Sequence, residues 1–173
     1  MEGKKINFKK EFSPRDEFAR LQNEFNNETP RSVAIVGCAY IDDLLNKLLK
    51  AVLIEDKKLF KDFIDRLTFE RRIIICYLLG LIDRNMMDDL KIISKIRNKF
   101  AHDKNLNSFN VEIISTECKK LKYILEVKWV DIDVFNTPRK KYQAAIAYYF
   151  GRFEECGNFC KRIDKKTLFN VPK

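Results

Sequence analysis

The sequence predicts an all-α protein from three observations. Apolar residues recur at helical spacing along most of the chain. The 14 phenylalanines outnumber the 5 glycines and 4 prolines together, so turn formers are too few for a barrel or sandwich of many short strands. Two Thr-Pro pairs, at Thr29 and Thr137, mark helix starts, because proline at the first helical position gives up an N–H group that has no partner there.

We expect one domain over residues 1–173, with a core bundle over about residues 12–156 and a loosely held basic tail over residues 157–173. The hydrophobic content of 46% is that of a packed globular protein. The first residues lack the apolar core of a signal peptide, and no segment supplies the ~18 consecutive apolar residues of a membrane span. These features predict a cytoplasmic protein without a membrane segment.

Two helices are expected in the first third of the chain. The first lies within residues 12–27 and ends at the polar pair Asn26-Asn27. Thr29 and Pro30 then begin a helix from Arg31 to about Leu53. Its wide apolar face is typical of a central helix.

An antiparallel helical hairpin follows a short amphipathic segment over residues 55–64. The first arm, Phe69 to Ile82, is apolar nearly all round, so we expect it to be buried. Its isoleucines also fit a buried strand, but no second run is available to pair with it. Asp83 is expected to cap the second arm.

Beyond the hairpin, the polar residues 103–110 predict a long loop. A helix is expected from about Val111 to Leu125, followed by an extended strap over residues 129–135. Thr137 and Pro138 then begin the last helix.

The candidate functional site lies in the second arm of the hairpin, at its end. His102 is the only histidine of the protein, and it stands five residues after Arg97. A helix turns ~100° per residue, which places Ser94, Asn98 and His102 in one row. Arg97 and His102 would lie ~140° apart, so they can serve one site only if the helix ends near Phe100 or a second subunit supplies the other half.

Arg97 falls on the apolar stripe of the same helix, so we expect its guanidinium to be partly buried. Such a group needs a carboxylate or carbonyl partner, and Asp42 and Asp43 flank the stripe of the long central helix. In the purely structural alternative, Arg97 is fully buried against one of these carboxylates. His102 then stabilises the helix C-terminus, where a cation is favoured.

Four stretches resemble the mannitol operon repressor (MltR-like) family, in family order over about residues 17–153. They are FARLQNEFNNETPRSVAIVGCAYIDDLLNKLL, YLLGLIDRNMMDDLKIISKIRNKFAH, SFNVEIISTECKKL and TPRKKYQAAIAYYF. The resemblance implies an all-α bundle and a bacterial role in the repression of gene expression.

That family in turn resembles HEPN helical domains, some of which are metal-independent RNases that work as dimers. Their motif, an arginine followed four to six residues later by a histidine, matches Arg97-Asn98-Lys99-Phe100-Ala101-His102. The resemblance implies that His102 is the general base or acid at a ribose 2′-hydroxyl, that Arg97 stabilises the phosphorane, and that Asn98 orients one of them. Lys104 stands where some HEPN toxins carry a tyrosine that their antitoxin modifies, so that mode of control is not expected.

Charge and cysteine content bound the partners and cofactors. The net charge of +9 is compatible with a nucleic-acid or other polyanionic partner, and equally with a solvated surface. Cys156 and Cys160 could form half of a metal site, but one histidine in the whole chain leaves the other ligands missing. No GxGxxG, GxxxxGK or GxSxG motif occurs, so we expect no cofactor and no metal.

Three functions remain. The first is an MltR-like regulator that represses gene expression indirectly, because no helix-turn-helix with a basic recognition helix is found. The second is a metal-independent RNase that uses Arg97, Asn98 and His102, most simply as a homodimer. The third is a structural or interaction bundle without catalysis. A fully buried Arg97 would favour the structural bundle, and an exposed Arg97 would favour the RNase.

Overall fold

The computed structural model describes residues 20–21, 23–122, 136–160 and 162–163. All regular secondary structure in this part of the chain is helical, which confirms the predicted all-α class. Residues 20–21 and 23–26 are helical. The elements that follow are α2 (Pro30–Val52), α3 (Lys57–Asp62), the 3-10 helix η1 (Ile64–Arg66), α4 (Phe69–Leu78), α5 (Arg84–His102), α6 (Glu112–Lys119) and α7 (Pro138–Phe159).

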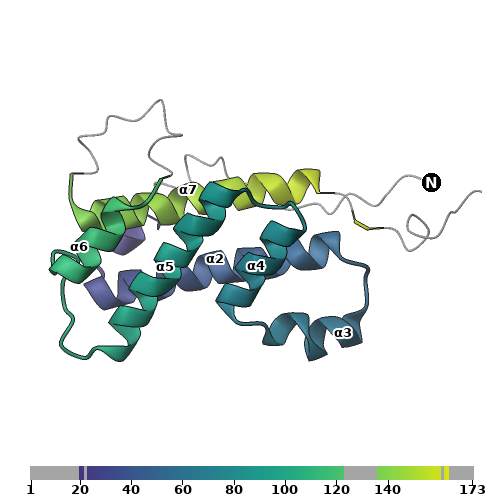
Figure 1. Cartoon of the computed structure of the whole chain (residues 1–173), viewed down its shortest axis with the longest axis horizontal. Helices are drawn as coiled ribbons and strands as arrows, with labels where there is room; N and C mark the ends of the chain where they lie inside the picture. The colour runs from purple at the N-terminus through teal and green to yellow at the C-terminus, as the bar shows by residue number, and fades with distance from the viewer. Residues whose placement is uncertain (1–19, 22, 123–135, 161, 164–173) are drawn as a thin grey trace, which may run out of the picture.

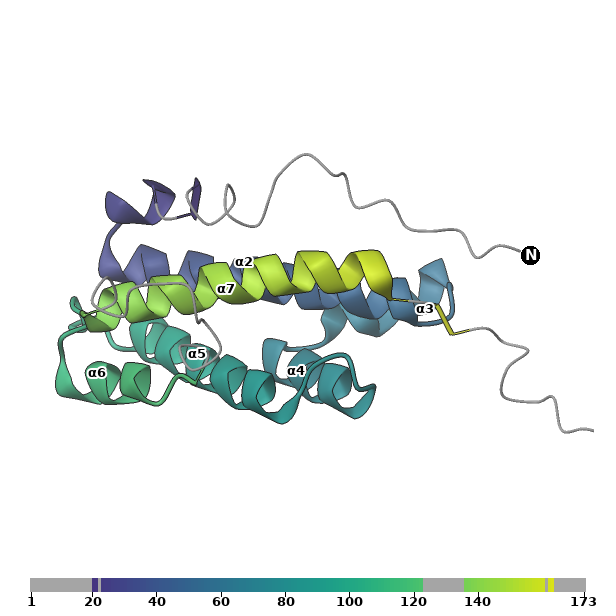
Figure 2. The same ribbon diagram turned by 90° about the horizontal axis from the view of Figure 1, so that it is seen from above.

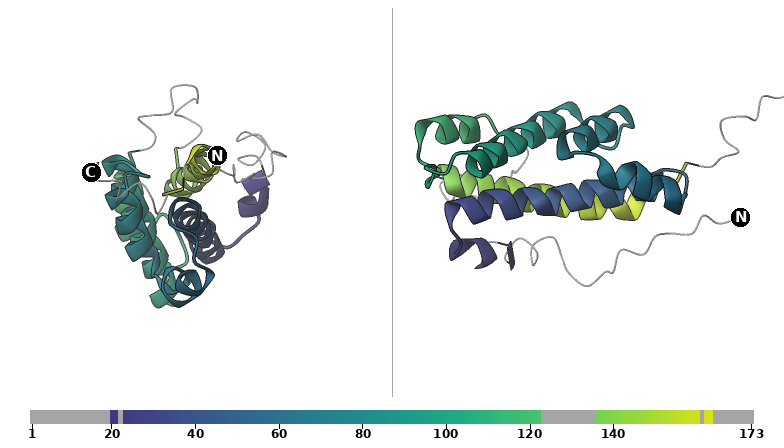
Figure 3. Two further views of the ribbon diagram at one scale, coloured as in Figure 1. Left: turned by 90° about the vertical axis from the view of Figure 1, so that its right-hand side faces the viewer. Right: turned by 90° about the horizontal axis from the view of Figure 1, so that it is seen from below.

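The helices form two layers (Figures 1 and 2). The long helices α2 and α7 run side by side in one layer. In the second layer α5 contacts α2 and lies between α4 and α6, as the end-on and lower views also show (Figure 3). The core is the space between the layers, and α5 therefore has one face toward the core and one face outward.

The predicted helix starts are confirmed by their capping hydrogen bonds. Thr29 Oγ1 accepts from the backbone N–H of Ser32 at 3.1 Å, and Asp83 Oδ1 accepts from that of Met86 at 2.9 Å. Thr137 caps α7 in the same way. These caps satisfy N–H groups that have no partner inside the helix, which is why the three starts could be predicted from sequence.

The closest approach of α2 and α7 occurs at Gly37. A Cβ atom placed there would lie 3.1 Å from Cγ1 of Ile146, so a larger residue would push the helices apart. The buried Tyr142 donates from its hydroxyl to the carbonyl of Ala34 at 2.9 Å. The pair of helices is therefore held by close packing and by a buried hydrogen bond between them.

The prediction for α4 was wrong in two respects. The helix ends at Leu78 instead of Ile82, because Gly80 takes a positive φ of 68°. The N–H groups of Gly80 and Leu81 bond back to the carbonyls of Tyr77 and Cys76, the pairing of a Schellman motif. The helix is also not buried on all sides, since Ile74 is 43% exposed and Leu78 is 75% exposed.

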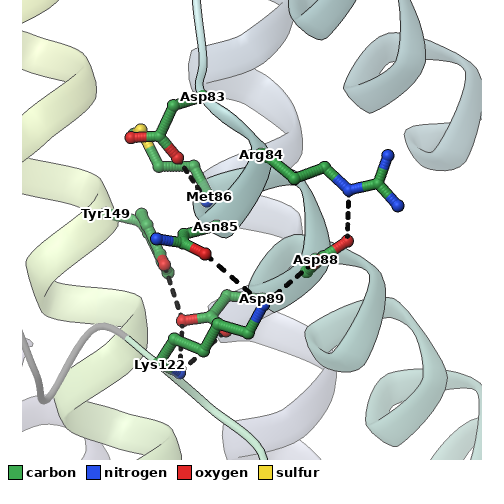
Figure 4. A network of polar contacts seen from close by, with 8 residues as sticks. All are labelled: Asp83, Arg84, Asn85, Met86, Asp88, Asp89, Lys122 and Tyr149. Carbon is green, nitrogen blue, oxygen red and sulfur yellow. Dashed lines mark hydrogen bonds and ion pairs between the residues drawn. The ribbon is translucent and has the colours of Figure 1, made fainter.

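The helix α6 is also shorter than predicted, and the chain beyond it bonds to another helix. Its last helical residue is Lys119, and the backbone N–H of Lys122 bonds to both carboxylate oxygens of Asp89, at 2.9 and 3.0 Å. Asp89 is buried on α5 and also accepts from the hydroxyl of Tyr149 on α7 (Figure 4). The carboxylate of Asp89 thus joins α5, α7 and the chain that leaves α6.

The last helix continues past residue 157, where the basic tail was predicted to begin. The helix α7 continues to Phe159, and the backbone N–H of Ile163 donates to the carbonyl of Val52 at 2.7 Å. Arg162 pairs with Glu55. Residues 164–173 lie outside the described residues, as do Phe12, Phe18, Leu125 and the predicted strap over residues 129–135. Within the described part, no helix combines the length and apolar content needed to cross a bilayer.

Candidate functional site

The helix α5 carries the candidate residues in its last two turns. It is regular through His102, and the backbone N–H of Asp103 still donates to the carbonyl of Lys99 at 3.0 Å. The helix therefore does not end near Phe100. The ~140° between Arg97 and His102 persists within one chain, and only the second of the two predicted arrangements, with two subunits, could join them in one site.

Arg97 is exposed, which contradicts the expectation that it is partly buried. Its Nη1 donates to Oδ1 of the neighbouring Asn98 at 2.8 Å. On the next face of the helix, the Ser94 hydroxyl donates to Glu70 of α4 at 3.1 Å.

The predicted carboxylate partners are used elsewhere. Asp42 pairs with Arg72 at 2.6 Å, and Asp43 pairs with Lys47 on the surface of α2. Arg72 is 7% exposed and also donates to the carbonyl of Asp65 at 3.0 Å. Among the described residues the buried arginine is therefore Arg72, and the sequence signal for it is an arginine next to the apolar run of α4.

Asn98 and His102 line an open hollow of about 370 Å³ on the outer face of α5. The other lining residues are Glu70, Lys91, Lys95 and Lys99. His102 is exposed and Asn98 is half-buried. Arg97 does not line the hollow and is connected to it through its hydrogen bond with Asn98. Of the six sequence candidates, the structure brings Asn98 and His102 together at the hollow and joins Arg97 to Asn98 alone, while Ser94 is buried and Asp42 and Asp43 lie on α2.

The lysines of the hollow were not among the predicted site residues. They lie four residues apart along α5, a spacing that places them on one face and that the sequence already displays. Lys95 pairs with Glu117 of α6 at 2.7 Å. Among the described residues, no hydrogen bond or ion pair is found for Lys91, Lys99 or His102.

Glu117 of α6 does not line the hollow but forms an ion pair with Lys95, which does. Its burial acts to raise the pKa of the carboxyl, but hydrogen bonds from Lys95 and from Lys120, the latter at 2.9 Å, outweigh burial and hold the pKa below its usual range. The carboxylate form is thus stabilised in the folded protein. One of the three lysines is consequently neutralised, and the two on either side of it remain available.

Arg31 of α2 fixes the end of α5. Its guanidinium donates to the carbonyl of Phe100, to that of Asp103 at 2.8 Å and to that of Leu106 at 3.4 Å. The loop after His102 was predicted to be polar, yet Phe109 is buried with its ring centroid 4.8 Å from that of Phe100. The position of His102 is therefore set by a buried anchor and by an arginine that binds three carbonyls.

Arg97 lies toward α2, although its side chain is exposed. Burial raises the pKa of the Cys38 thiol to about 12, and the positive charge of Arg97 opposes that rise. Cys38, Cys76 and Cys118 are buried, whereas Cys156 and Cys160 are half-buried on α7 and its C-cap. In the described part of the chain, no group of three histidine, cysteine or acidic residues is arranged to hold a metal ion.

No model of a known protein family matches the chain, and a search of curated proteins finds no match. Among solved structures, the chain is similar to one chain in the X-ray structure of the MtlR–HPr complex from Escherichia coli. The TM-score is 0.60 and the identity 17%, over 80% of this chain and 98% of that chain. The likeness supports the MltR-like fold that the sequence predicts, and a fold by itself does not establish a function.

Proposed function

We propose that the protein is an MltR-like regulator that represses gene expression indirectly, through contacts with another protein. The likeness in fold to a chain of a two-protein complex, over nearly the whole of that chain, carries this proposal. The exposed apolar residues of α4 agree with it. Ile74 and Leu78 lie one turn apart on the surface, where a soluble helix without a partner more often presents polar side chains.

The test is binding to the HPr protein of the same organism, measured by isothermal titration calorimetry with both proteins purified. We expect a complex, and we expect Leu78→Gln to weaken it by about tenfold or more if α4 supplies the contact. Ile113→Gln on α6 is the matched control, because Ile113 is 46% exposed on a different helix. Absence of any heat of binding with the wild-type protein would contradict HPr as the partner.

A second function, a metal-independent endoribonuclease, is favoured by the exposure of Arg97 and His102. The purely structural alternative required Arg97 to be buried against Asp42 or Asp43, and that arrangement does not occur. In the enzyme, His102 removes or returns the proton of a ribose 2′-hydroxyl, and Arg97 stabilises the charge on the phosphorane. Asn98 holds the guanidinium in place through the 2.8 Å hydrogen bond.

A homodimer follows from this second proposal. Because α5 is regular, Arg97 and His102 of one chain point in directions ~140° apart, so a composite site takes each residue from a different copy. Mixed dimers test this directly. Arg97→Ala and His102→Ala should each abolish cleavage of total RNA in EDTA, and an equilibrated equal mixture should regain about a quarter of wild-type activity.

The quarter arises because half of the dimers are mixed, and one of the two sites in each mixed dimer is intact. Lys57→Ala on α3 serves as the control variant, since Lys57 is exposed and distant in sequence from the site. Cleavage that survives His102→Ala would come from a contaminant and contradict the enzyme. Two inactive variants that fail to complement would contradict the composite site, and with it the ribonuclease proposal.

A further inference from the structure

We propose that the hollow on α5 binds the phosphodiester backbone of a nucleic-acid strand through Lys91 and Lys99, which line it together with His102. Lys91 lies outside the stretch from Arg97 to His102, and Lys99 lies within it but has no role in the ribonuclease proposal above. The inference rests on the ribonuclease proposal for the identity of the strand as RNA. Binding itself is measured separately from cleavage.

The distribution of charge in the hollow supports an anionic ligand. Lys91, Lys95 and Lys99 are spaced by ~6 Å along the helix axis, a rise comparable to the separation of neighbouring phosphates in an extended strand. Glu117 neutralises Lys95, and the two outer lysines have no ion pair among the described residues. Asp88, which stands three residues before Lys91, is already paired with Arg84 and with Lys122 at 3.0 Å (Figure 4).

The one carboxylate among the described lining residues does not cancel this charge. Glu70 of α4 accepts a hydrogen bond from the hydroxyl of Ser94 at 3.1 Å and is the residue that α4 contributes to the lining of the hollow. The lining thus combines three lysines and an imidazole with one carboxylate. Lysine binds phosphate as a point charge through strong, orientation-tolerant donors, which suits a ligand that is held along its length.

The shape of the hollow favours a strand over a small phosphorylated molecule. Sites for small ligands enclose most of the ligand surface and converge a few polar groups on it. This hollow is open, and neither an arginine nor a phenylalanine, tyrosine or tryptophan ring is among its lining residues. Without a large aromatic ring to stack on, the bases contribute little, so we expect contacts mainly to phosphates, with strong dependence on salt and little on sequence.

The single histidine supplies a direct reporter of binding. His102 lines the hollow, so its Hε1 resonance is the one imidazole signal of the chain and lies at the proposed site. The probe is a short single-stranded uridine oligomer in EDTA, with 2′-O-methyl groups so that it cannot be cleaved at the 2′-hydroxyl. We expect this resonance to shift on addition of the oligomer, and fluorescence anisotropy of a labelled copy to give the affinity.

A charge-matched pair of variants separates the hollow from general attraction to a basic protein. Lys91→Gln with Lys99→Gln should weaken binding by about tenfold or more and reduce the salt slope by roughly 1 to 2. Lys57→Gln with Lys61→Gln on α3 removes the same charge from exposed lysines elsewhere and should change the affinity by no more than about twofold. Both double variants carry a net charge of +7, from +9 − 2.

Three results would overturn the inference, and a fourth would separate it from the ribonuclease proposal. Equal weakening by both double variants would mean that net charge alone attracts the oligomer. Binding without a shift of His102 Hε1 would place the strand elsewhere, and tighter binding of a polyglutamate peptide than of the oligomer would make the occupant an acidic protein segment. Oligomer binding at the hollow together with intact total RNA would refute the enzyme and retain the site.

Discussion

Arg72 and Arg97 lie on neighbouring helices and have opposite surroundings. Arg72, near the start of α4, is buried, pairs with Asp42 at 2.6 Å and donates to two carbonyls of the preceding turn. Arg97, near the end of α5, is exposed and bonds only to the side chain next to it among the contacts described. The first arginine stabilises the fold, whereas the second is free to meet a ligand or a second copy of the chain.

The difference shows that the angular position of a residue on a helix does not determine its burial. Arg97 lies on the same stripe as the buried Leu90 and Ile93. Its side chain is nevertheless exposed, and its guanidinium bonds to the neighbouring Asn98. Burial therefore depends on the neighbouring surfaces in the packed structure as well as on the position around the helix.

Equal contributions of Arg72 and Arg97 to stability would contradict the difference in their surroundings. We expect Arg72→Ala to lower the free energy of unfolding by about 3 kcal/mol, because it leaves the Asp42 carboxylate and two carbonyls without their donor. Arg97→Ala should change it by no more than ~0.5 kcal/mol, as for other exposed side chains. Urea denaturation of both variants at neutral pH measures the two values, and similar losses would mean that Arg97 is buried in solution.

Loss of the Arg31 side chain should lower the free energy of unfolding by an amount between those for Arg72 and Arg97. Arg31→Ala removes the donor to three carbonyls at the end of α5 and in the following loop, and we expect a loss of about 1 to 2 kcal/mol. Amide exchange in residues 103–111 should become faster than in α2. Arg31→Lys should restore only part of the protection, because a lysine cannot bind three carbonyls as a planar fork. Unchanged exchange in this loop would show that Phe109 alone holds it.

Glu117 extends the comparison to pH, and we expect Glu117→Gln to lower the free energy of unfolding at neutral pH by about 1 kcal/mol, less than Arg72→Ala. Because its pKa is lowered in the folded state, its contribution is present above the ordinary glutamate pKa. That contribution is lost as the pH falls through the folded-state value. The wild-type protein should therefore lose more stability than Glu117→Gln between pH 7 and acidic pH in thermal unfolding. Parallel losses would contradict the proposed hydrogen bonds from Lys95 and Lys120.

The two hairpin arms show how far sequence could define the candidate site. The motif from Arg97 to His102, the cap at Asp83 and the row of Asn98 and His102 on one face depend on local geometry, and each could be predicted from residue spacing. The contribution of Glu70 could not, because it reaches the hollow from α4, 28 residues before Asn98 in the chain. The pairing of Asp42 with Arg72 instead of Arg97 likewise depended on which helix lies nearer.

The sequence by itself determined the helical class and the helix starts at Thr29, Asp83 and Thr137, and it placed Asn98 and His102 on one face of a helix, because caps and periodicity act within a few residues. Only the tertiary structure decided where α6 ends, which arginine is buried and which lysines share a hollow with His102. Those outcomes depend on contacts between residues far apart in the chain. Burial and ion pairing are properties of neighbouring surfaces, and a single helix does not contain that information.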